Sequence, residues 1–189
     1  MATTAARVRR VPPRGKVVVI LLAGAAVAVS LGVYARVHDP SGLSLVTLFF
    51  TATINLKVWL ATGAFALALF QLVSALRLYG KIGSGRPPRW LGRAHRASGT
   101  GAFLLSIPVA YHCLWALGFQ SVTETRVLIH GLAGCFFYGA LMSKVLIVRS
   151  RRLPGWTLPV VGGSLFTALT VIWLTSSFWF FTTQEFPGF

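Results

Sequence analysis

Residues 97–148 read ASGTGAFLLSIPVAYHCLWALGF, QSVTE and TRVLIHGLAGCFFYGALMSKVLIV, two long apolar runs separated by a short, more polar connection. Each run exceeds the roughly 20 residues that an α-helix needs to cross a hydrocarbon core about 30 Å thick. A connection this short predicts that the two helices are antiparallel neighbours. The segment therefore predicts a helical hairpin inside a membrane.

Three further apolar runs extend this pattern over the chain of 189 residues. Only 11% of the residues are charged and 55% are hydrophobic, whereas a soluble domain carries about 25% charged residues. We predict an all-α integral membrane bundle of five transmembrane helices, with spans at about 17–34, 55–78, 97–119, 125–148 and 157–182. A basic tail, 1–16, precedes this domain of residues 17–182, and a short tail, 183–189, follows it.

Two features of the first half of the chain complete the outline. A cleaved signal peptide is the alternative for the first run, but the run is longer than the usual apolar core of a signal, so a retained span is favoured. After the turn cluster that begins at His38, the apolar residues 43–50 predict a helix that lies along the membrane interface. His38 itself is expected to be a solvated loop residue.

The charged residues are distributed unevenly about the spans. The formal net charge is +15, and all three acids, Asp39, Glu124 and Glu185, fall on one predicted side. Fifteen basic residues fall on the other side: Arg7, Arg9, Arg10, Arg14, Lys16, Arg77, Lys81, Arg86, Arg89, Arg93, Arg96, Lys144, Arg149, Arg151 and Arg152. The positive-inside rule then places the N-terminus in the cytoplasm and the C-terminus outside, in the cell membrane. Such a surface attracts anionic lipids. No folded basic domain is predicted, which argues against nucleic acid as a partner.

Two histidines inside the spans are the candidate functional residues. His112 and His130 each lie nine residues from Ser121, at the middle of the predicted hairpin, and so at equal depth, roughly 7 to 10 Å below the outer boundary. Ionisable residues in a membrane are costly and are by default hypotheses about function. Two imidazoles at one level on neighbouring helices predict the axial ligands of a single b-type haem.

The surroundings of these histidines fit a cofactor site. Gly131 and Gly134 would allow a flat macrocycle to approach the helix backbone closely. Arg126 lies one turn before His130 on the same face, where it would pair with a haem propionate. Pro108 lies one turn before His112 and is expected to kink the span and open room for a cofactor.

A structural interpretation stands beside the cofactor hypothesis. A membrane histidine often bonds only to a carbonyl or hydroxyl of a neighbouring helix, and glycines are common packing devices. Gln71 and Ser74 are expected to form such interhelical hydrogen bonds, while Lys57 is expected to snorkel to the outer surface. Trp156 and Trp179 flank the last span as predicted interfacial anchors.

The segment His95, Arg96, Ala97, Ser98, Gly99 resembles the H-R-x-S-G signature of the membrane-anchor subunit of succinate dehydrogenase. In that family the Arg lies by the quinone site and the His approaches a haem propionate, so the resemblance implies cofactor contacts for His95 and Arg96. The five-span plan is similar to small b-type cytochromes that move electrons across bilayers. Residues 89–182 are also similar to a family of small bacterial membrane proteins with no assigned function.

These observations predict a haem-binding membrane protein that relays electrons to or from a quinone or a partner redox subunit. No nucleotide-binding motif or carboxylate pair is visible, which favours an electron-transfer subunit over a self-contained enzyme. The alternative is a haem-free accessory or scaffold subunit of a larger membrane complex. In that case the small residues from Gly162 to Thr170 would pack against another protein.

Overall fold

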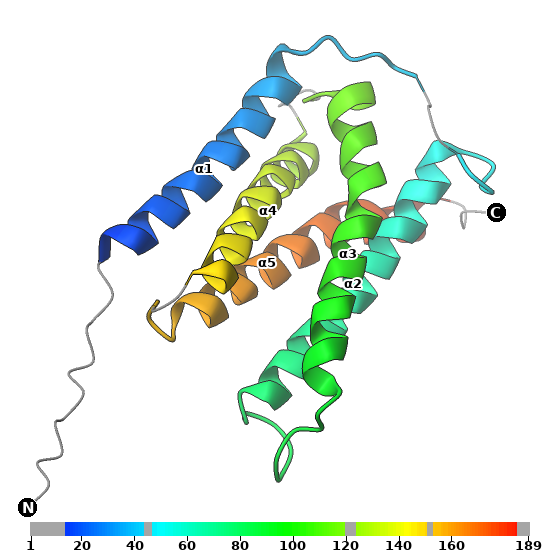
Figure 1. Cartoon of the computed structure of the whole chain (residues 1–189). Helices are drawn as coiled ribbons and strands as arrows, with labels where there is room; N and C mark the ends of the chain where they lie inside the picture. The colour runs from blue at the N-terminus through cyan, green and yellow to red at the C-terminus, as the bar shows by residue number, and fades with distance from the viewer. Residues whose placement is uncertain (1–13, 44–46, 120–123, 151–152, 185–189) are drawn as a thin grey trace, which may run out of the picture.

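All regular secondary structure in the described part of the chain is helical (Figure 1). The computed structural model describes residues 14–43, 47–119, 124–150 and 153–184. Within these ranges five helical runs are long and apolar enough to cross a membrane, which confirms the predicted number of spans and the all-helical class. The runs are α1 (Arg14–Val37), α2 (Thr53–Leu78), α3 (Leu91–Tyr111) with the π-helical η1 (His112–Leu117), α4 (Thr125–Arg149), and α5 (Thr157–Trp173) with the π-helical η2 (Leu174–Phe178) and α6 (Trp179–Thr183).

The helices pack in two groups, and a contact between α2 and α5 connects them. In one group α4 lies between α1 and α5, and in the other α3 packs along α2 (Figure 1). The predicted hairpin of the third and fourth spans is therefore wrong in its packing, because α3 and α4 are consecutive but each has its main contacts elsewhere. A short connection fixes which helices follow one another, but not which faces they bury. The middle of that connection, 120–123 with Ser121, lies outside the described residues.

Two glycines set the closest helix contact, between α1 and α4. A Cβ atom added at Gly139 would lie 2.5 Å from the Gly24 carbonyl oxygen and 2.9 Å from the Ala28 side chain. Ser143 lies one turn further along α4, and its hydroxyl donates to the Ile20 carbonyl at 3.4 Å. Because small residues let backbones approach this closely, α4 takes α1 as its neighbour.

Two of the spans change to π-helical geometry near the same end of the bundle. Pro108 lies inside α3, where it has no N–H to donate, and the α-helix ends at Tyr111 and continues as η1. The fifth span makes the same change at Leu174. The expected kink at Pro108 stays a prediction. Single π-helical turns occur frequently at functional sites. The space that the two π-helical turns border is therefore a candidate site.

The connection between α1 and α2 differs from its prediction. Thr47–Phe50 form a turn in which the Phe50 N–H donates to the Thr47 carbonyl at 3.0 Å, and Leu48 has a φ of 50°. A left-handed residue cannot continue a right-handed helix, so the expected interfacial helix at 43–50 is wrong for the described residues, which exclude 44–46.

His38 is also not the solvated residue that the sequence led us to expect. Its Nε2–H donates to the Trp115 carbonyl at 3.2 Å. Its ring stacks on Tyr34, with centroids 5.0 Å apart, and lies 4.7 Å from the Trp115 ring. His38 therefore connects the end of α1 to η1. This contact could not be predicted from the residues next to His38 in the sequence.

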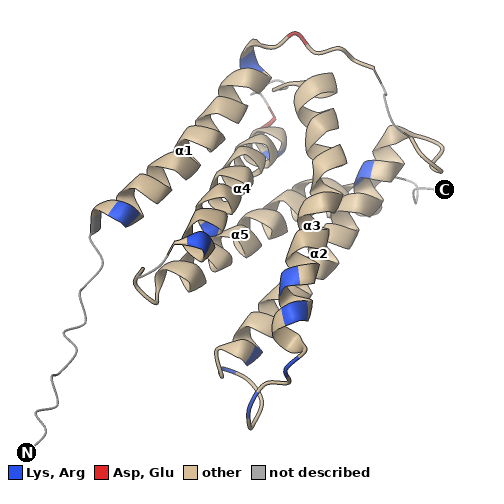
Figure 2. Cartoon of the chain, in the orientation of Figure 1, with Lys and Arg blue, Asp and Glu red and all other residues tan. Residues whose placement is uncertain are grey.

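The charges separate along the bundle as predicted. Figure 2 shows basic residues gathered at the end where α1 begins and α4 ends, and the described acids, Asp39 and Glu124, at the opposite end. Arg7, Arg9, Arg10, Arg151, Arg152 and Glu185 lie outside the described residues. The two ends of the bundle therefore differ in charge, which is the feature that relates to orientation in a membrane.

The α1–α4 contact makes a first prediction about stability. Gly139→Ala should lower the free energy of unfolding by about 1–3 kcal/mol, since the added methyl group meets backbone that must shift. The matched control is Gly163→Ala, where an added Cβ meets no atom within 4 Å and helix propensity favours Ala. Unfolding by a denaturing detergent measures both. Equal effects of the two substitutions would contradict the described contact.

Candidate functional site

A cavity of about 370 Å³ lies where the two helix groups diverge. Its wall is mostly apolar and is built from all five spans, including both π-helical turns. The polar side chains that matter most for its chemistry are Lys57, Arg126, His130, Tyr138 and Thr175. Among the described residues no Asp or Glu lines it. A concave apolar pocket with a few convergent polar groups is the usual form of a small-molecule site.

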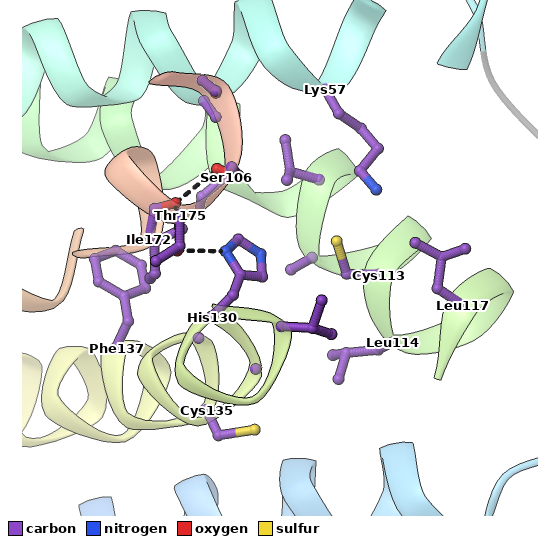
Figure 3. Close-up of a pocket in the computed structure, with 18 of the residues that line it drawn as sticks. Lys57, Ser106, Cys113, Leu114, Leu117, His130, Cys135, Phe137, Ile172 and Thr175 are labelled. Atoms are coloured by element: carbon purple, nitrogen blue, oxygen red, sulfur yellow. Dashed lines mark hydrogen bonds between the residues drawn. The ribbon is translucent and has the colours of Figure 1, made fainter. Parts of the chain in front are cut away.

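His130 presents one ring nitrogen to this cavity. Its Nδ1 lies 3.1 Å from the Thr175 hydroxyl oxygen, and that hydroxyl also lies 2.7 Å from the Val171 carbonyl oxygen. A carbonyl only accepts, so when the one hydroxyl hydrogen is donated to Val171 the hydroxyl oxygen accepts from His130 Nδ1–H, and we assign this tautomer to the ring. The unprotonated Nε2 then points away from Thr175, toward the side of the cavity where Lys57 and Cys113 lie (Figure 3).

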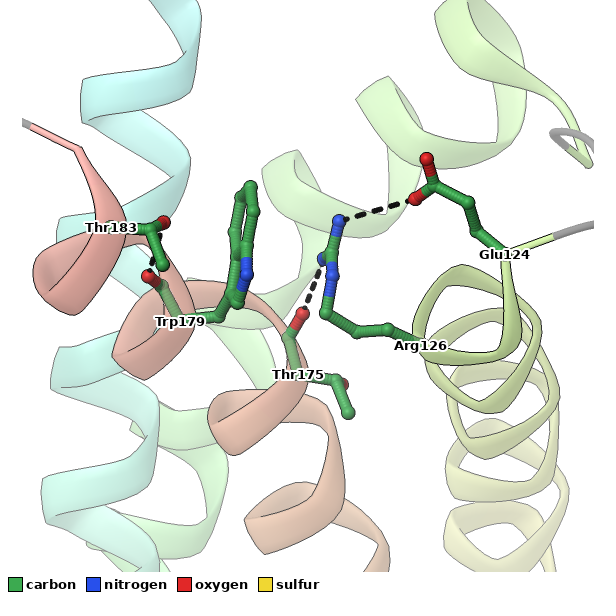
Figure 4. A network of polar contacts seen from close by, with 5 residues as sticks. All are labelled: Glu124, Arg126, Thr175, Trp179 and Thr183. Atoms are coloured by element: carbon green, nitrogen blue, oxygen red, sulfur yellow. Dashed lines mark hydrogen bonds and ion pairs between the residues drawn. The ribbon is translucent and has the colours of Figure 1, made fainter.

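Thr175 also accepts a hydrogen bond from Arg126, the second polar side chain of α4 at this site. Arg126 Nη1 donates to the Thr175 carbonyl at 2.8 Å, and the guanidinium carbon lies 3.8 Å from the centroid of the Trp179 ring. Glu124 lies 3.8 Å from Arg126 in an exposed ion pair (Figure 4). The predicted position of Arg126, one turn from His130, is confirmed. The guanidinium is held in place by three neighbours.

The predicted glycines line the cavity, but with different surroundings. A Cβ atom at Gly134 would meet nothing within 4 Å, so the backbone there borders open space. At Gly131 it would lie 3.1 Å from the Phe119 ring. On another part of the wall, the Tyr138 hydroxyl donates to Ser106 Oγ at 2.9 Å and bridges α4 to α3. Tyr138 is thus satisfied by α3 rather than by a histidine.

His112 does not line this cavity. It borders a smaller one of about 30 Å³, beside the first turn of α2. Its Nδ1 and the Thr53 Oγ1 are buried without a hydrogen-bond partner in the described part of the chain, and both residues border this small space. Lys57 lines both cavities. Equal distance from a turn fixes depth but not the direction around the helix axis, so the structure does not place the two histidines in one cavity.

His95 and Arg96 lie at the opposite end of the α2–α3 pair. Ser74 Oγ and His95 Nδ1 are hydrogen-bonded at 2.7 Å, and Gln71 Nε2 donates to the His95 carbonyl and to Ser98 Oγ. The expected interhelical role of Gln71 and Ser74 is confirmed. Arg96 is exposed, and neither His95 nor Arg96 lines the large cavity.

For three residues of the site, the sequence either gave no signal or led to an interpretation that differs from their place in the structure. Thr175 carried no signal beyond being one of several hydroxyl residues in the last span. Lys57 was assigned to the surface although a cation inside a span is itself a signal. Trp179 was interpreted only as an anchor; it is 36% exposed, and its ring also lies 3.8 Å from the Arg126 guanidinium carbon. Trp156 is 57% exposed.

Fold and cavity together define a multi-pass helical membrane protein with a mostly apolar cavity between its spans. The chain belongs to DUF6529, a family of unknown function, whose match covers residues 17–188. Comparison with curated proteins and with solved structures gave no match. Within the described ranges no group of three or more His, Cys, Asp or Glu residues is arranged to hold a metal ion. Cys113 and Cys135 are free thiols.

The contact between His130 and Thr175 makes a second prediction. Thr175→Val should lower the free energy of unfolding by about 0.5–1.5 kcal/mol, because it removes the hydrogen bond between His130 Nδ1 and the Thr175 hydroxyl that joins α4 to η2. Thr170→Val is the matched control, since the Thr170 hydroxyl bonds only back to Phe166 of its own helix. Detergent unfolding of the two variants measures the difference. A loss no larger than that of the control would show that the bond is absent.

Proposed function

We propose that this protein binds one b-type haem in the large cavity through His130 and relays single electrons to or from a quinone or a partner redox subunit. The observation that carries the proposal is the free Nε2 of His130, which faces an apolar cavity while Nδ1–H is bound to Thr175. Histidines that ligate metals usually donate their other ring N–H to a fixed acceptor, which sets the tautomer and the ring orientation.

The rest of the wall fits a haem. The open space beside Gly134 gives a flat ring room next to the α4 backbone, and Arg126, a fixed cation, is suited to a propionate. When bound, a haem supplies one-electron redox chemistry at its iron. The protein supplies the ligand nitrogen, the apolar surroundings and the cation, and the electron partner is a separate molecule.

Two assignments made from the sequence stay predictions, one for His112 and one for His95 with Arg96. His112 is the predicted second axial ligand, and in the structure it borders the neighbouring small cavity. A quinone contact at His95 and Arg96 rests on the resemblance to the succinate dehydrogenase anchor, and these residues lie in the first turns of α3, next to the basic connection from α2. The cavity and the basic end would then be two separate places of electron exchange.

For orientation we propose a cytoplasmic N-terminus and an outer C-terminus in the cell membrane. The support is the gathering of basic residues at one end (Figure 2), which the positive-inside rule assigns to the cytoplasm. Anionic lipids are then expected at that face. The large cavity, which Arg126 lines, would lie toward the outer side.

Fusions to the C-terminus test the orientation. Alkaline phosphatase, which folds only outside the cytoplasm, should be active there, while a green fluorescent protein fusion should stay dark. A fusion after Ser150, at the end of α4, is the matched control and should give the reverse pattern. A fluorescent C-terminal fusion would overturn the proposal.

A haem-free accessory subunit is the second candidate. One observation favours it: Cβ atoms added at Gly162 and Gly163 would meet nothing within 4 Å, so this part of α5 has space for another helix. Small residues of this kind serve helix packing in membranes. The two candidates differ in whether the purified chain contains haem.

Reduced-minus-oxidised absorption spectra of the detergent-purified protein test the haem proposal. The parent should show haem bands, and His130→Ala should lose them because the ligand nitrogen is gone. His112→Ala should change the axial character if His112 supplies the second nitrogen. His95→Ala is the matched control, since His95 lies away from the cavity. A parent without haem after expression in haem-replete cells would overturn the proposal and favour the accessory subunit.

A further inference from the structure

We infer that the cavity binds a membrane-soluble amphiphile with a carboxylate, and that Lys57 binds this carboxylate. The inference rests on the proposed function in that it concerns the same cavity, and it names the ligand class. Haem, with its propionates, is one source of such a carboxylate, and a long-chain fatty acid is another.

Lys57 belongs to the first turns of α2 and is directed inward. The helix begins at Thr53, and the side chain of Lys57 points into the large cavity (Figure 3). The residue is half-buried. A snorkelling lysine would turn its ammonium group to the outer surface. The observed direction therefore calls for a different explanation.

The ammonium group has no anion to pair with in the described part of the chain. Lys57 forms no ion pair or hydrogen bond there, and no described Asp or Glu lines the cavity. Charged side chains inside membranes usually pair with one another or with backbone carbonyls because an unpaired charge is costly. Arg126, the other cation of the wall, already has Thr175, Trp179 and Glu124 as neighbours. Lys57 is thus the charge that a ligand would satisfy.

Further polar atoms without partners lie beside Lys57. Thr53 is only 6% exposed, and its hydroxyl has no hydrogen-bond partner among the described residues. The same holds for the buried His112 Nδ1, and both border the small cavity that Lys57 also borders. About 30 Å³ is enough for a water molecule or a ligand oxygen. Hydrogen-bonding capacity therefore gathers around Lys57, the cation of the cavity wall that has no partner among the described residues.

The charge and shape of the cavity select the ligand class. One free ammonium group balances one carboxylate, such as that of a fatty acid or one of the two propionates of a haem, whereas a phosphate monoester carries nearly two negative charges on a single group at neutral pH. The remaining wall is mostly apolar and suits a hydrocarbon or aromatic body. An acid with a large apolar body satisfies both parts of the site.

Binding of paired acids and esters to the full-length protein tests the inference. One arm uses haem and its dimethyl ester, followed by absorbance; the other uses palmitate and its methyl ester, followed by calorimetry. At least one acid should bind about 10-fold or more tightly than its ester, as expected for a hydrogen bond to a charged group. This comparison uses the unchanged protein and does not depend on the folding of a variant.

Substitutions then assign the effect to Lys57. Lys57→Met should remove the preference for the acid and Lys57→Arg should keep it. Lys144→Met is the matched control, a partly buried lysine of α4 that does not line the cavity. Equal binding of acid and ester, no binding of either acid, or a preference that survives in Lys57→Met would overturn the inference.

The outcomes separate this inference from the haem proposal. If palmitate binds through Lys57 but the chain takes up no haem, the carboxylate site stands and the haem proposal fails. If haem and its dimethyl ester bind equally well through His130, and palmitate binds no better than its ester, the haem proposal stands and the carboxylate site fails.

Discussion

The hydrogen bond from His130 Nδ1–H to the Thr175 hydroxyl connects α4 to the last span at the point where that span becomes π-helical. The Thr175 hydroxyl is already committed to the carbonyl one turn earlier, at Val171. With the histidine assigned as the donor, its other nitrogen is left free to accept or to ligate. In a membrane, where an unsatisfied polar group costs several kcal/mol, this arrangement decides both the helix contact and the chemistry of the cavity.

The cavity exists because the spans do not form a single close-packed bundle. Gly24 and Gly139 bring α1 and α4 into backbone contact, while Gln71 and Ser74 hold α3 on α2 at the basic end. The two groups therefore diverge at the other end, where η1 and η2 line the space between them. Arg126 of α4 and Lys57 of α2 line that space. Arg126 is held by Thr175 and Trp179, whereas Lys57 has no partner among the described residues.

Much of this architecture was predictable from the sequence, since the length of the apolar runs and the placement of charges reflect the thickness and polarity of the bilayer. The interhelical role of Gln71 and the position of Arg126 beside His130 follow from helical periodicity. The separation of α3 from α4, and so of His112 from His130, was not predictable. This separation depends on which helix faces pack together. Gly139 indicates that α4 packs on α1 only when Gly24 is known to be its contact.

The most direct test of this account is the protonation of the two ring nitrogens of His130. Solid-state nitrogen NMR of histidine-labelled protein in bilayers, with the resonance assigned by comparison with His130→Ala, measures it at neutral pH without added ligand. The account predicts a neutral ring with its proton on Nδ1 and a bare Nε2. A proton on Nε2, with Nδ1 bare, would show that Thr175 donates to the ring and that no ligand nitrogen faces the cavity, which contradicts the central claim.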